Sequence, residues 1–263
     1  KIYQSCKWFY YFCKSMKDIK DNFSAQADIY AQYRPGYPGA LFDWLYTHCR
    51  HFDRALDCAT GNGQAAAKLA EKFELVNAID ISISQLENSY KAPNIQYSVE
   101  KAEQSSFPDN SFDLITVAQA LHWFDHKNYF AQMCKVAKPG ALFAAWGYSL
   151  LRINKEIDSL TDDLYTNVTG PYWDEERKHI DNKYNSIPFP FALLPCPDFS
   201  ISYPWKAEHM IGYLNTWSAV QHYIKKNNKN PVDLIKEKLL SVWGEQERIV
   251  TFPIFMKAGY IDK

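Results

Sequence analysis

Short apolar runs alternate with helical patterns along residues 40–146. Five runs of apolar or alternating residues predict strands, because each is short and bounded by turn signals. These strands are expected at 55–58, 75–79, 94–99, 112–118 and 141–146. Helices are expected at 40–48, at 64–73, from Ser82 or Ser84 onward, and at 129–137, where Lys138-Pro139-Gly140 would end the helix. The alternation predicts an α/β fold with a doubly wound parallel sheet.

The pattern changes after Gly147. Residues 148–205 are rich in aromatic side chains and interrupted by prolines, which predicts a cap over the carboxyl edge of the sheet. Beyond it, the expected elements are helices at 208–225 and 231–242 and an edge strand at 249–256 that contains Pro253. No linker separates these parts, so residues 23–263 are expected to form one domain with the cap inserted.

A glycine turn follows the first expected strand. Residues 57–63 read Asp-Cys-Ala-Thr-Gly-Asn-Gly, and the second strand ends in another acid, Asp80. Gly61 and Gly63 allow the backbone to approach a ligand closely, and Asp80 can accept hydrogen bonds from both hydroxyls of a ribose. The spacing therefore predicts a nucleoside-bearing cofactor.

Three interpretations of this turn remain open. Lys68 lies too far from Gly63 for a phosphate-cradling loop, and only a final-alanine variant of the dinucleotide fingerprint is present. Asp57 would repel a pyrophosphate, whereas it suits the amino group of S-adenosylmethionine. The alternatives are a nicotinamide or flavin dinucleotide, and a turn that serves only close packing of a helix on the sheet.

Composition narrows the class of partner. The chain has 263 residues and a formal net charge of −1, which gives no electrostatic footprint for nucleic acid. No apolar stretch reaches the length of a membrane span. The six cysteines form no zinc spacing and no Cys-x-x-Cys pair, which predicts reduced thiols, a cytoplasmic location and no bound metal. A monomer and a homodimer both remain open.

Residues 1–22 are expected to be an extension of the domain. The stretch before Met16 is rich in aromatic residues and does not begin with methionine, so Met16 is the expected natural start. The stretch is too short and too rich in tyrosine for a secretory signal, and no small-residue cleavage site follows it.

Four stretches carry a resemblance to a known family. They are Tyr30, Tyr33, Arg34, Pro35, Tyr37 and Pro38; the turn at 57–63; residues 106–113; and residues 118–125, Ala-Gln-Ala-Leu-His-Trp-Phe-Asp. These motifs resemble those of class I S-adenosylmethionine-dependent methyltransferases of the type 11 group, and within it the trans-aconitate methyltransferase-like enzymes. The resemblance covers residues 23–260 and implies a Rossmann-like, mostly parallel sheet of about seven strands, the last one antiparallel.

The resemblance also implies where S-adenosylmethionine would bind. Asp57, Ala59, Gly61 and Gly63 would line its methionine end, Asp80 would hold the ribose, Ile81, Ala102 and Glu103 would meet the adenine, and Gln119 would close the pocket beneath the sulfonium. Two residues depart from the family pattern. Ala59 replaces the usual first glycine, and Lys101 stands where many relatives have an acid. Adenine recognition is therefore expected to rest on backbone groups or on Glu103.

The acceptor implied by the resemblance is a small molecule methylated on a carboxylate oxygen. A carboxylate is ionised at neutral pH and needs cations and donors rather than a base, so Arg34 is the first candidate to hold it, assisted by Tyr30 and Tyr33. His122 is the second catalytic candidate, as a base or a donor, with a structural role equally open. The remaining substrate candidates are Trp123, Trp146, Tyr148 and Trp217.

Two other classes of function remain open. A C-methyltransferase acting on a quinone or sterol-like acceptor would need a base and an apolar cap, which the aromatic residues of 148–205 permit. A non-catalytic cofactor-binding protein is the other alternative. Asp57, Asp80, Gly61, Gly63 and Gln119 occur together, which favours an enzyme over a non-catalytic protein.

Overall fold

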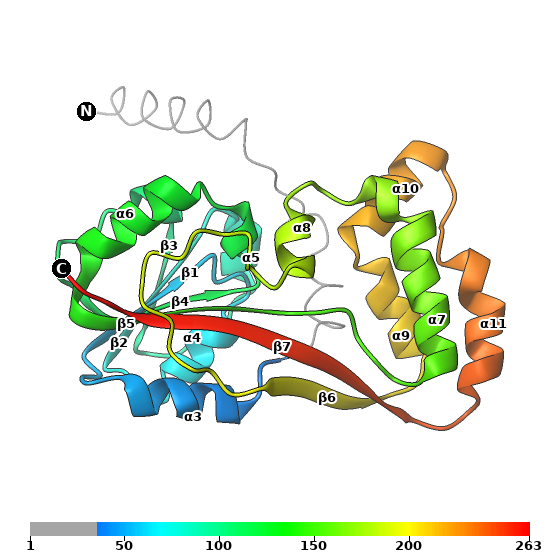
Figure 1. Ribbon diagram of the computed structural model, residues 1–263, viewed down its shortest axis with the longest axis horizontal. Coiled ribbons are helices and arrows are strands. Elements are labelled where there is room, and N and C mark those ends of the chain that lie inside the picture. Colours follow the sequence, from blue (N-terminus) through cyan, green and yellow to red (C-terminus); the bar gives the residue numbers. More distant parts are fainter. Residues whose placement is uncertain (1–35) are drawn as a thin grey trace.

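The computed structural model describes residues 36–263, in which helices flank a central sheet and a helical lobe lies at one end (Figure 1). The strands are β1 (Arg54–Cys58), β2 (Leu75–Asp80), β3 (Ile95–Val99), β4 (Phe112–Ala118), β5 (Ala137–Tyr148), β6 (Phe199–Trp205) and β7 (Arg248–Ile261). They form one sheet in the order β3-β2-β1-β4-β5-β7-β6. β7 is antiparallel to both of its neighbours, and the other neighbouring pairs are parallel. The predicted Rossmann-like sheet with an antiparallel last strand is therefore confirmed.

Some helices bury the two faces of the sheet, and others form the helical lobe. The helices are α3 (Gly39–His48), α4 (Gln64–Leu69), α5 (Ile83–Glu87), α6 (His126–Val136), α7 (Lys155–Asp163), α8 (Arg177–Asp181), α9 (Ala207–Asn215), α10 (Ser218–Asn227) and α11 (Asp233–Trp243). Short turns lie at η2 (Ala102–Gln104), η3 (Leu121–Trp123), η4 (Leu164–Val168) and η5 (Gly170–Tyr172). The predicted helix start is confirmed at Ser82, whose hydroxyl accepts a hydrogen bond from the Gln85 amide.

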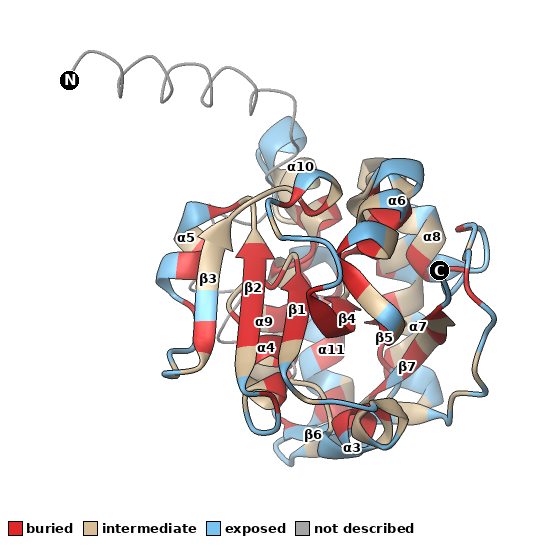
Figure 2. Cartoon of the chain, turned by 90° about the vertical axis from the view of Figure 1, so that its left-hand side faces the viewer, coloured by how far each residue is buried: buried red, intermediate tan, exposed pale blue. Residues whose placement is uncertain are grey.

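Two hydrophobic cores lie on opposite faces of the sheet. Successive strand residues alternate between them: Ala55 of β1 packs in the core that contains α3 and α4, and Leu56 packs in the core that contains α6. β1, β2 and β4 are buried over nearly their whole length (Figure 2). This burial on both faces explains why these strands are mostly apolar and do not alternate with polar residues.

A helical lobe lies beside the outer ends of β6 and β7. It contains α7, α9, α10 and α11, and α11 contacts both α7 and α9 (Figure 1). The sequence predicted a cap at about 148–205. In the structure, residues 199–205 form β6, and three of the four helices of the lobe come from residues 207–243.

The sequence predicted that the last strand lies at the edge of the sheet, and this prediction is wrong. β7 lies between β5 and β6 and extends over Arg248–Ile261, well beyond the expected 249–256. Its second half, which pairs with β5, was missed because Lys257 and Gly259 interrupt the alternation. The strand at this edge of the sheet is β6. It was not predicted as a strand, because prolines lie within it and before it.

Two further boundaries correct the sequence analysis. The expected helix at 208–225 is two helices, because Trp217 is extended (ψ 131°) and the Thr216 hydroxyl donates to the Tyr213 carbonyl at 2.6 Å. Lys138-Pro139-Gly140 does not form a separate turn after α6. These residues lie within β5, where Gly140 has φ +75° and the pairing with β4 shifts register.

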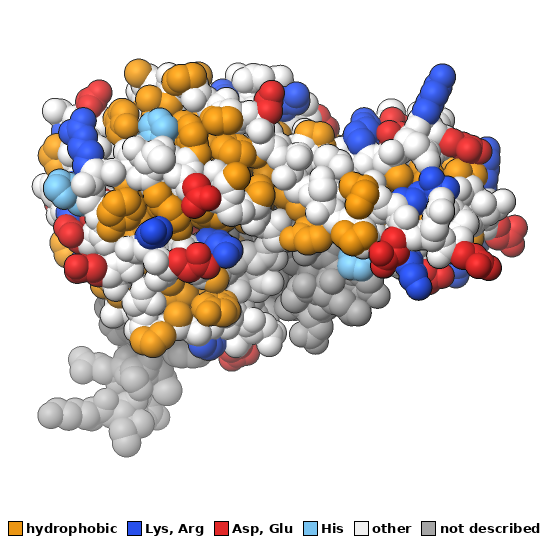
Figure 3. Space-filling view, turned by 90° about the horizontal axis from the view of Figure 1, so that it is seen from below, with side chains coloured by type: hydrophobic (Ala, Val, Ile, Leu, Met, Phe, Trp, Pro, Cys, Tyr) orange, Lys and Arg blue, Asp and Glu red, His pale blue; other side chains and the backbone are white. Residues whose placement is uncertain are grey.

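Among the residues that the structure describes, the face of the molecule in Figure 3 shows no charged docking surface. On the face shown in Figure 3, basic and acidic side chains are interspersed with hydrophobic ones rather than gathered by sign. Within residues 36–263, no helix is both long enough and apolar enough to cross a bilayer.

Candidate active site

A pocket of about 540 Å³ opens at the carboxyl edge of the sheet. Its walls come from the segments that follow β1, β2, β3, β4 and β5. The chain changes direction across the sheet between β1 and β4, and open α/β sheets bind their ligands at such a switch point. The pocket brings together part of the set that the sequence proposed for cofactor and substrate: Ala59, Gly61, Asp80, Ile81, Ala102, Glu103, Gln119, Trp123 and Tyr148.

The glycine turn has three residues in the left-handed region. Ala59, Gly61 and Gly63 have φ of +51°, +56° and +81°. Gly63 is required at its position, because a Cβ there would overlap the hydroxyl of Tyr97. Gly63 itself is the N-cap of α4 and does not belong to the pocket wall.

Replacing Ala59 by glycine is expected to stabilise the protein. An L-residue in the left-handed region costs about 1–2 kcal/mol, and the extra freedom of glycine in the unfolded chain offsets part of the gain. We expect the free energy of unfolding to rise by roughly 0.5–1 kcal/mol, measured by urea denaturation. Gly61→Ala is the matched control, and it should lower the free energy of unfolding for the same reason.

Asp80 is held at the end of β2 by two backbone amides. Its Oδ2 accepts from Gly61 N at 2.9 Å and its Oδ1 accepts from Ser82 N at 2.8 Å. These bonds fix the carboxylate against the turn, where a ribose would lie. The orientation suits the predicted role, because each carboxylate oxygen has further lone pairs to accept from a hydroxyl.

Asp57 lies beneath the turn, fully buried and outside the pocket wall. The hydroxyls of Thr60 and Thr116 donate to its two oxygens at 2.5 and 2.8 Å. Burial raises the pKa of Asp57 to about 6, and the two hydroxyl donors limit the rise. Its carboxylate can therefore act on a ligand through its charge, rather than by direct contact.

The segment after β3 forms the far end of the pocket. Glu103 accepts from the amide of Asp125 at 3.1 Å, which ties the η2 turn to the start of α6. Glu100 also lines this end and was missed by the sequence analysis. Its carboxylate is held by Ser98 and by the amide and hydroxyl of Ser106.

Gln119 connects the ends of β4 and β5. It has φ +57°, its amide donates to the Trp146 carbonyl at 2.7 Å, and its Oε1 accepts from the Tyr148 amide at 2.8 Å. A Cβ at Gly147 would approach that Oε1 to 2.7 Å, so Gly147 leaves room for the contact. The side chain of Gln119 therefore positions Tyr148 at the wall of the pocket.

His122 is buried away from the pocket. Its Nδ1 lies 3.4 Å from the hydroxyl of Tyr184, and the imidazole is not part of the pocket wall. Burial lowers the pKa of His122 to about 3, with a further contribution from the charge of Arg177. The imidazole is therefore neutral at physiological pH and is placed for packing rather than for proton transfer to a ligand.

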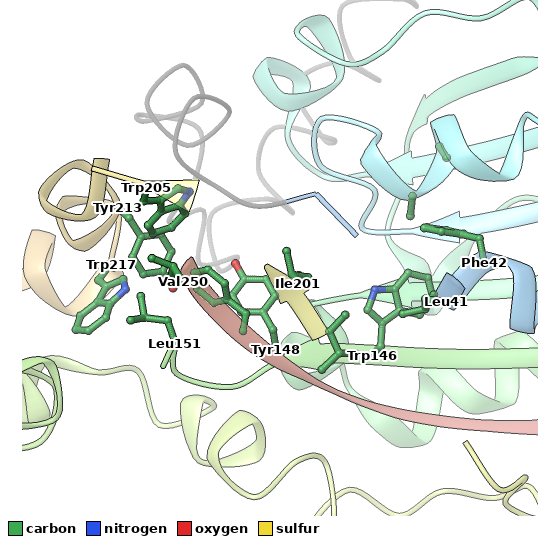
Figure 4. Close-up of a cluster of buried hydrophobic side chains, with 14 of the residues drawn as sticks. Leu41, Phe42, Trp146, Tyr148, Leu151, Ile201, Trp205, Tyr213, Trp217 and Val250 are labelled. Atoms are coloured by element: carbon green, nitrogen blue, oxygen red, sulfur yellow. The ribbon is translucent and has the colours of Figure 1, made fainter. Parts of the chain in front are cut away.

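The other predicted substrate residues divide into two groups. Trp146 and Trp217 are buried in the core cluster of Figure 4 and are not part of the pocket wall. Tyr30, Tyr33 and Arg34 lie outside the described residues. In residues 36–263, no group of three or more His, Cys, Asp or Glu side chains could hold a metal.

Several pocket residues were not predicted as site residues, and three of them come from other parts of the chain than the predicted motif residues or carry a side chain that can contact a ligand. Tyr37 was recognised as part of a motif without a role, and it lines the pocket beside the turn. Gln64 follows the glycine turn at the start of α4. Glu176 comes from the loop before α8, and no pattern in the sequence indicated that this loop returns to the sheet.

Fold and site together define a Rossmann-like protein with a pocket at the carboxyl edge of its sheet, beside a glycine turn and an acid at the end of β2. Comparison with known proteins identifies the family. The sequence profile of the methyltransferase domain matches residues 56–145. A protein named as a methyltransferase in Dictyostelium discoideum is 33% identical over 245 residues, covering 90% of this chain and 93% of that protein.

A solved structure agrees with this assignment. The structure of a type II methyltransferase from Anaeromyxobacter dehalogenans has a TM-score of 0.82 and 40% identity, covering 88% of this chain and 99% of its own. A methyltransferase structure from Bacillus halodurans, with a TM-score of 0.51 and 18% identity, shares the fold. The chain belongs to the class I S-adenosylmethionine-dependent methyltransferases, and its cofactor is S-adenosylmethionine.

The residues present fit this cofactor. The left-handed turn at 59–63 leaves the backbone open to a close approach, and Asp80 is oriented for the ribose hydroxyls. The buried charge of Asp57 lies under the turn, where a cationic methionine end would be attracted. When bound, S-adenosylmethionine supplies an electrophilic methyl group on a sulfonium.

Proposed function

We propose that this methyltransferase acts on a small molecule and methylates a carboxylate oxygen. The observation that carries the proposal is the exclusion of His122 from the pocket: within the described chain, no histidine lines the pocket wall. An acceptor that is already ionised at neutral pH needs no general base. In-line methyl transfer then requires only alignment and exclusion of water.

Arg34 is the proposed partner of the acceptor carboxylate. It precedes Gly36 by two residues in the sequence, and Tyr37, the residue after Gly36, lines the pocket. A guanidinium can bind a carboxylate through two parallel hydrogen bonds.

Turnover of carboxylic acids tests the proposal. We would incubate the protein with S-adenosylmethionine that carries a labelled methyl group and a panel of mono-, di- and tricarboxylic acids, and detect methyl esters by mass spectrometry. Arg34→Gln should lower kcat/KM for an accepted acid by roughly 100-fold, the loss expected for a charge-assisted pair. Its affinity for S-adenosylhomocysteine should be unchanged. Arg50→Gln is the control, because Arg50 packs over the ring of Tyr260 and does not line the pocket.

The other classes of function give different outcomes. If the protein binds S-adenosylhomocysteine and esterifies no carboxylic acid, the proposal is wrong. Methylation of a quinone in detergent would then identify a C-methyltransferase, and absence of turnover with both acceptor types would favour a non-catalytic role.

A further inference from the structure

We propose that Tyr97 is a positioning residue for S-adenosylmethionine: its hydroxyl holds the glycine turn in the shape that binds the cofactor. Tyr97 belongs to β3, which β2 separates from β1 and the turn that follows it, and Tyr97 does not line the pocket. It therefore acts through the backbone of other residues. The inference concerns the cofactor alone, so it does not depend on which acceptor is methylated.

The hydroxyl of Tyr97 lies against the last residue of the glycine turn. A Cβ at Gly63 would overlap this oxygen and would lie 3.3 Å from the ring carbon Cζ. The amide of Gly63 donates to the Thr60 carbonyl at 3.0 Å, which closes the turn. The Tyr97 oxygen therefore fills the space into which Gly63 could otherwise move, and the missing side chain of Gly63 allows this close approach.

A hydrogen bond from the same hydroxyl fixes a second contact with the turn. The Tyr97 hydroxyl donates to the Tyr90 carbonyl at 2.6 Å, and the Tyr90 amide donates to the Asn62 carbonyl at 3.1 Å. Asn62 lies in the turn and lines the pocket. Tyr97 is thus connected to the pocket wall through one residue, so a displacement of its hydroxyl would also displace Asn62.

The ring of Tyr97 is itself held in place. The ammonium of Lys91 lies 4.9 Å from the centre of the ring, and it donates to the Leu86 carbonyl at 2.9 Å and to the Ser89 hydroxyl at 3.0 Å. These bonds tie the ring to the end of α5, which lies beside β3 (Figure 2). Burial raises the pKa of Tyr97, so its hydroxyl stays protonated at neutral pH and remains a donor.

The shape of the turn matters for binding because its backbone forms part of the pocket. Ala59, Thr60, Gly61 and Asn62 all line the wall on this side. A turn that moves in the free protein has to be ordered when the cofactor binds, and this ordering lowers the affinity. A turn that Tyr97 already holds in place avoids that loss.

Tyr97→Phe tests the inference, because it removes the hydroxyl and keeps the half-buried ring. We expect this variant to bind S-adenosylhomocysteine roughly three- to tenfold more weakly in calorimetric titration, the change that corresponds to one lost hydrogen bond. Tyr46→Phe is the matched control. The Tyr46 hydroxyl also donates to a backbone carbonyl, that of Lys68, at 2.6 Å, and neither residue lines the pocket. This control should show a comparable fall in thermal unfolding temperature and keep the affinity of the parent protein.

A double-mutant cycle separates positioning of the turn from a general loss of stability. Gly63→Ala should weaken binding of S-adenosylhomocysteine by at least about tenfold in the parent protein, because the new methyl group and the Tyr97 oxygen cannot occupy the same space. In the Tyr97→Phe background, the same substitution should weaken binding by less than about threefold. The strain of an alanine in the left-handed region is present in both backgrounds, so the difference between them measures the contact with the hydroxyl.

Each outcome either supports or overturns the role of Tyr97. Parent-like affinity in Tyr97→Phe overturns the inference, and so does an equal loss of affinity in Tyr46→Phe. An equal effect of Gly63→Ala in both backgrounds also overturns it, because the hydroxyl would then not be what holds the turn. Reduced affinity in Tyr97→Phe alone, with a smaller effect of Gly63→Ala in that background, supports it. None of these results bears on carboxylate methylation, which is tested with acceptors.

Discussion

Replacing Asp80 by alanine is expected to weaken binding of S-adenosylhomocysteine by at least about 100-fold. Two losses add. The ribose loses up to two hydrogen bonds to a charged acceptor, each contributing roughly 1.5–3 kcal/mol, and the turn loses the carboxylate that now accepts from Gly61 N and Ser82 N. Calorimetric titration of the purified protein measures the effect directly.

Two further variants make this result specific. Asp80→Asn keeps one side-chain acceptor, so its affinity should lie between those of the parent protein and the alanine variant. Asp109→Ala removes an exposed acid that lies 3.7 Å from Lys135 and should leave binding unchanged. If Asp80→Ala binds as tightly as the parent protein, the assignment of the ribose to the end of β2 is wrong.

Neutralising Asp57 should make the protein more stable, most of all at alkaline pH. Burial raises the pKa of Asp57 from its ordinary value of 3.8 to about 6 in the folded protein. Because the pKa of Asp57 is higher in the folded than in the unfolded protein, the free energy of unfolding is highest below pH 3.8. It falls as the pH rises through 6. The difference amounts to roughly 3 kcal/mol above pH 7, since one pKa unit corresponds to about 1.4 kcal/mol.

Urea denaturation at pH 5 and pH 8 distinguishes this effect from a general change in packing. Asp57→Asn should raise the free energy of unfolding relative to the parent protein by more at pH 8 than at pH 5. Asp113 provides a contrast, because it is also buried but lies 2.8 Å from Lys138. Asp113→Asn should lower stability at pH 8. An equal gain for Asp57→Asn at both pH values would contradict the assigned pKa.

The sequence is sufficient to predict the fold wherever a local pattern repeats. The runs at 75–79 and 112–118 read as strands because β2 and β4 are buried on both faces, so most of their residues are apolar. Pairing between segments far apart in sequence was harder to predict. β6 contains Pro204 and exposes most of its side chains, so only its partner β7 identifies it as a strand.

Site residues that lie at strand ends were predicted, whereas those whose position depends on distant segments of the chain were not. Gly61 and Asp80 lie at the ends of strands, where strand order alone brings them together. His122 follows β4 in the same way, yet its side chain turns into the core against Tyr184, a residue 62 positions later. Glu176 reaches the pocket on a returning loop. Contacts that depend on such loops leave no periodic signal.

The position of β7 has a consequence for how the chain folds during synthesis. β7 follows every other described element, yet it fills the space between β5 and β6 and completes the pairing of both. While it is still being translated, those two strands have open edges, and the apolar surface that Phe252 and Ala258 later cover is exposed. Open strand edges and uncovered apolar surface are sites of aggregation. We therefore expect the nascent chain to expose these edges and this apolar surface until residues 248–261 have left the ribosome.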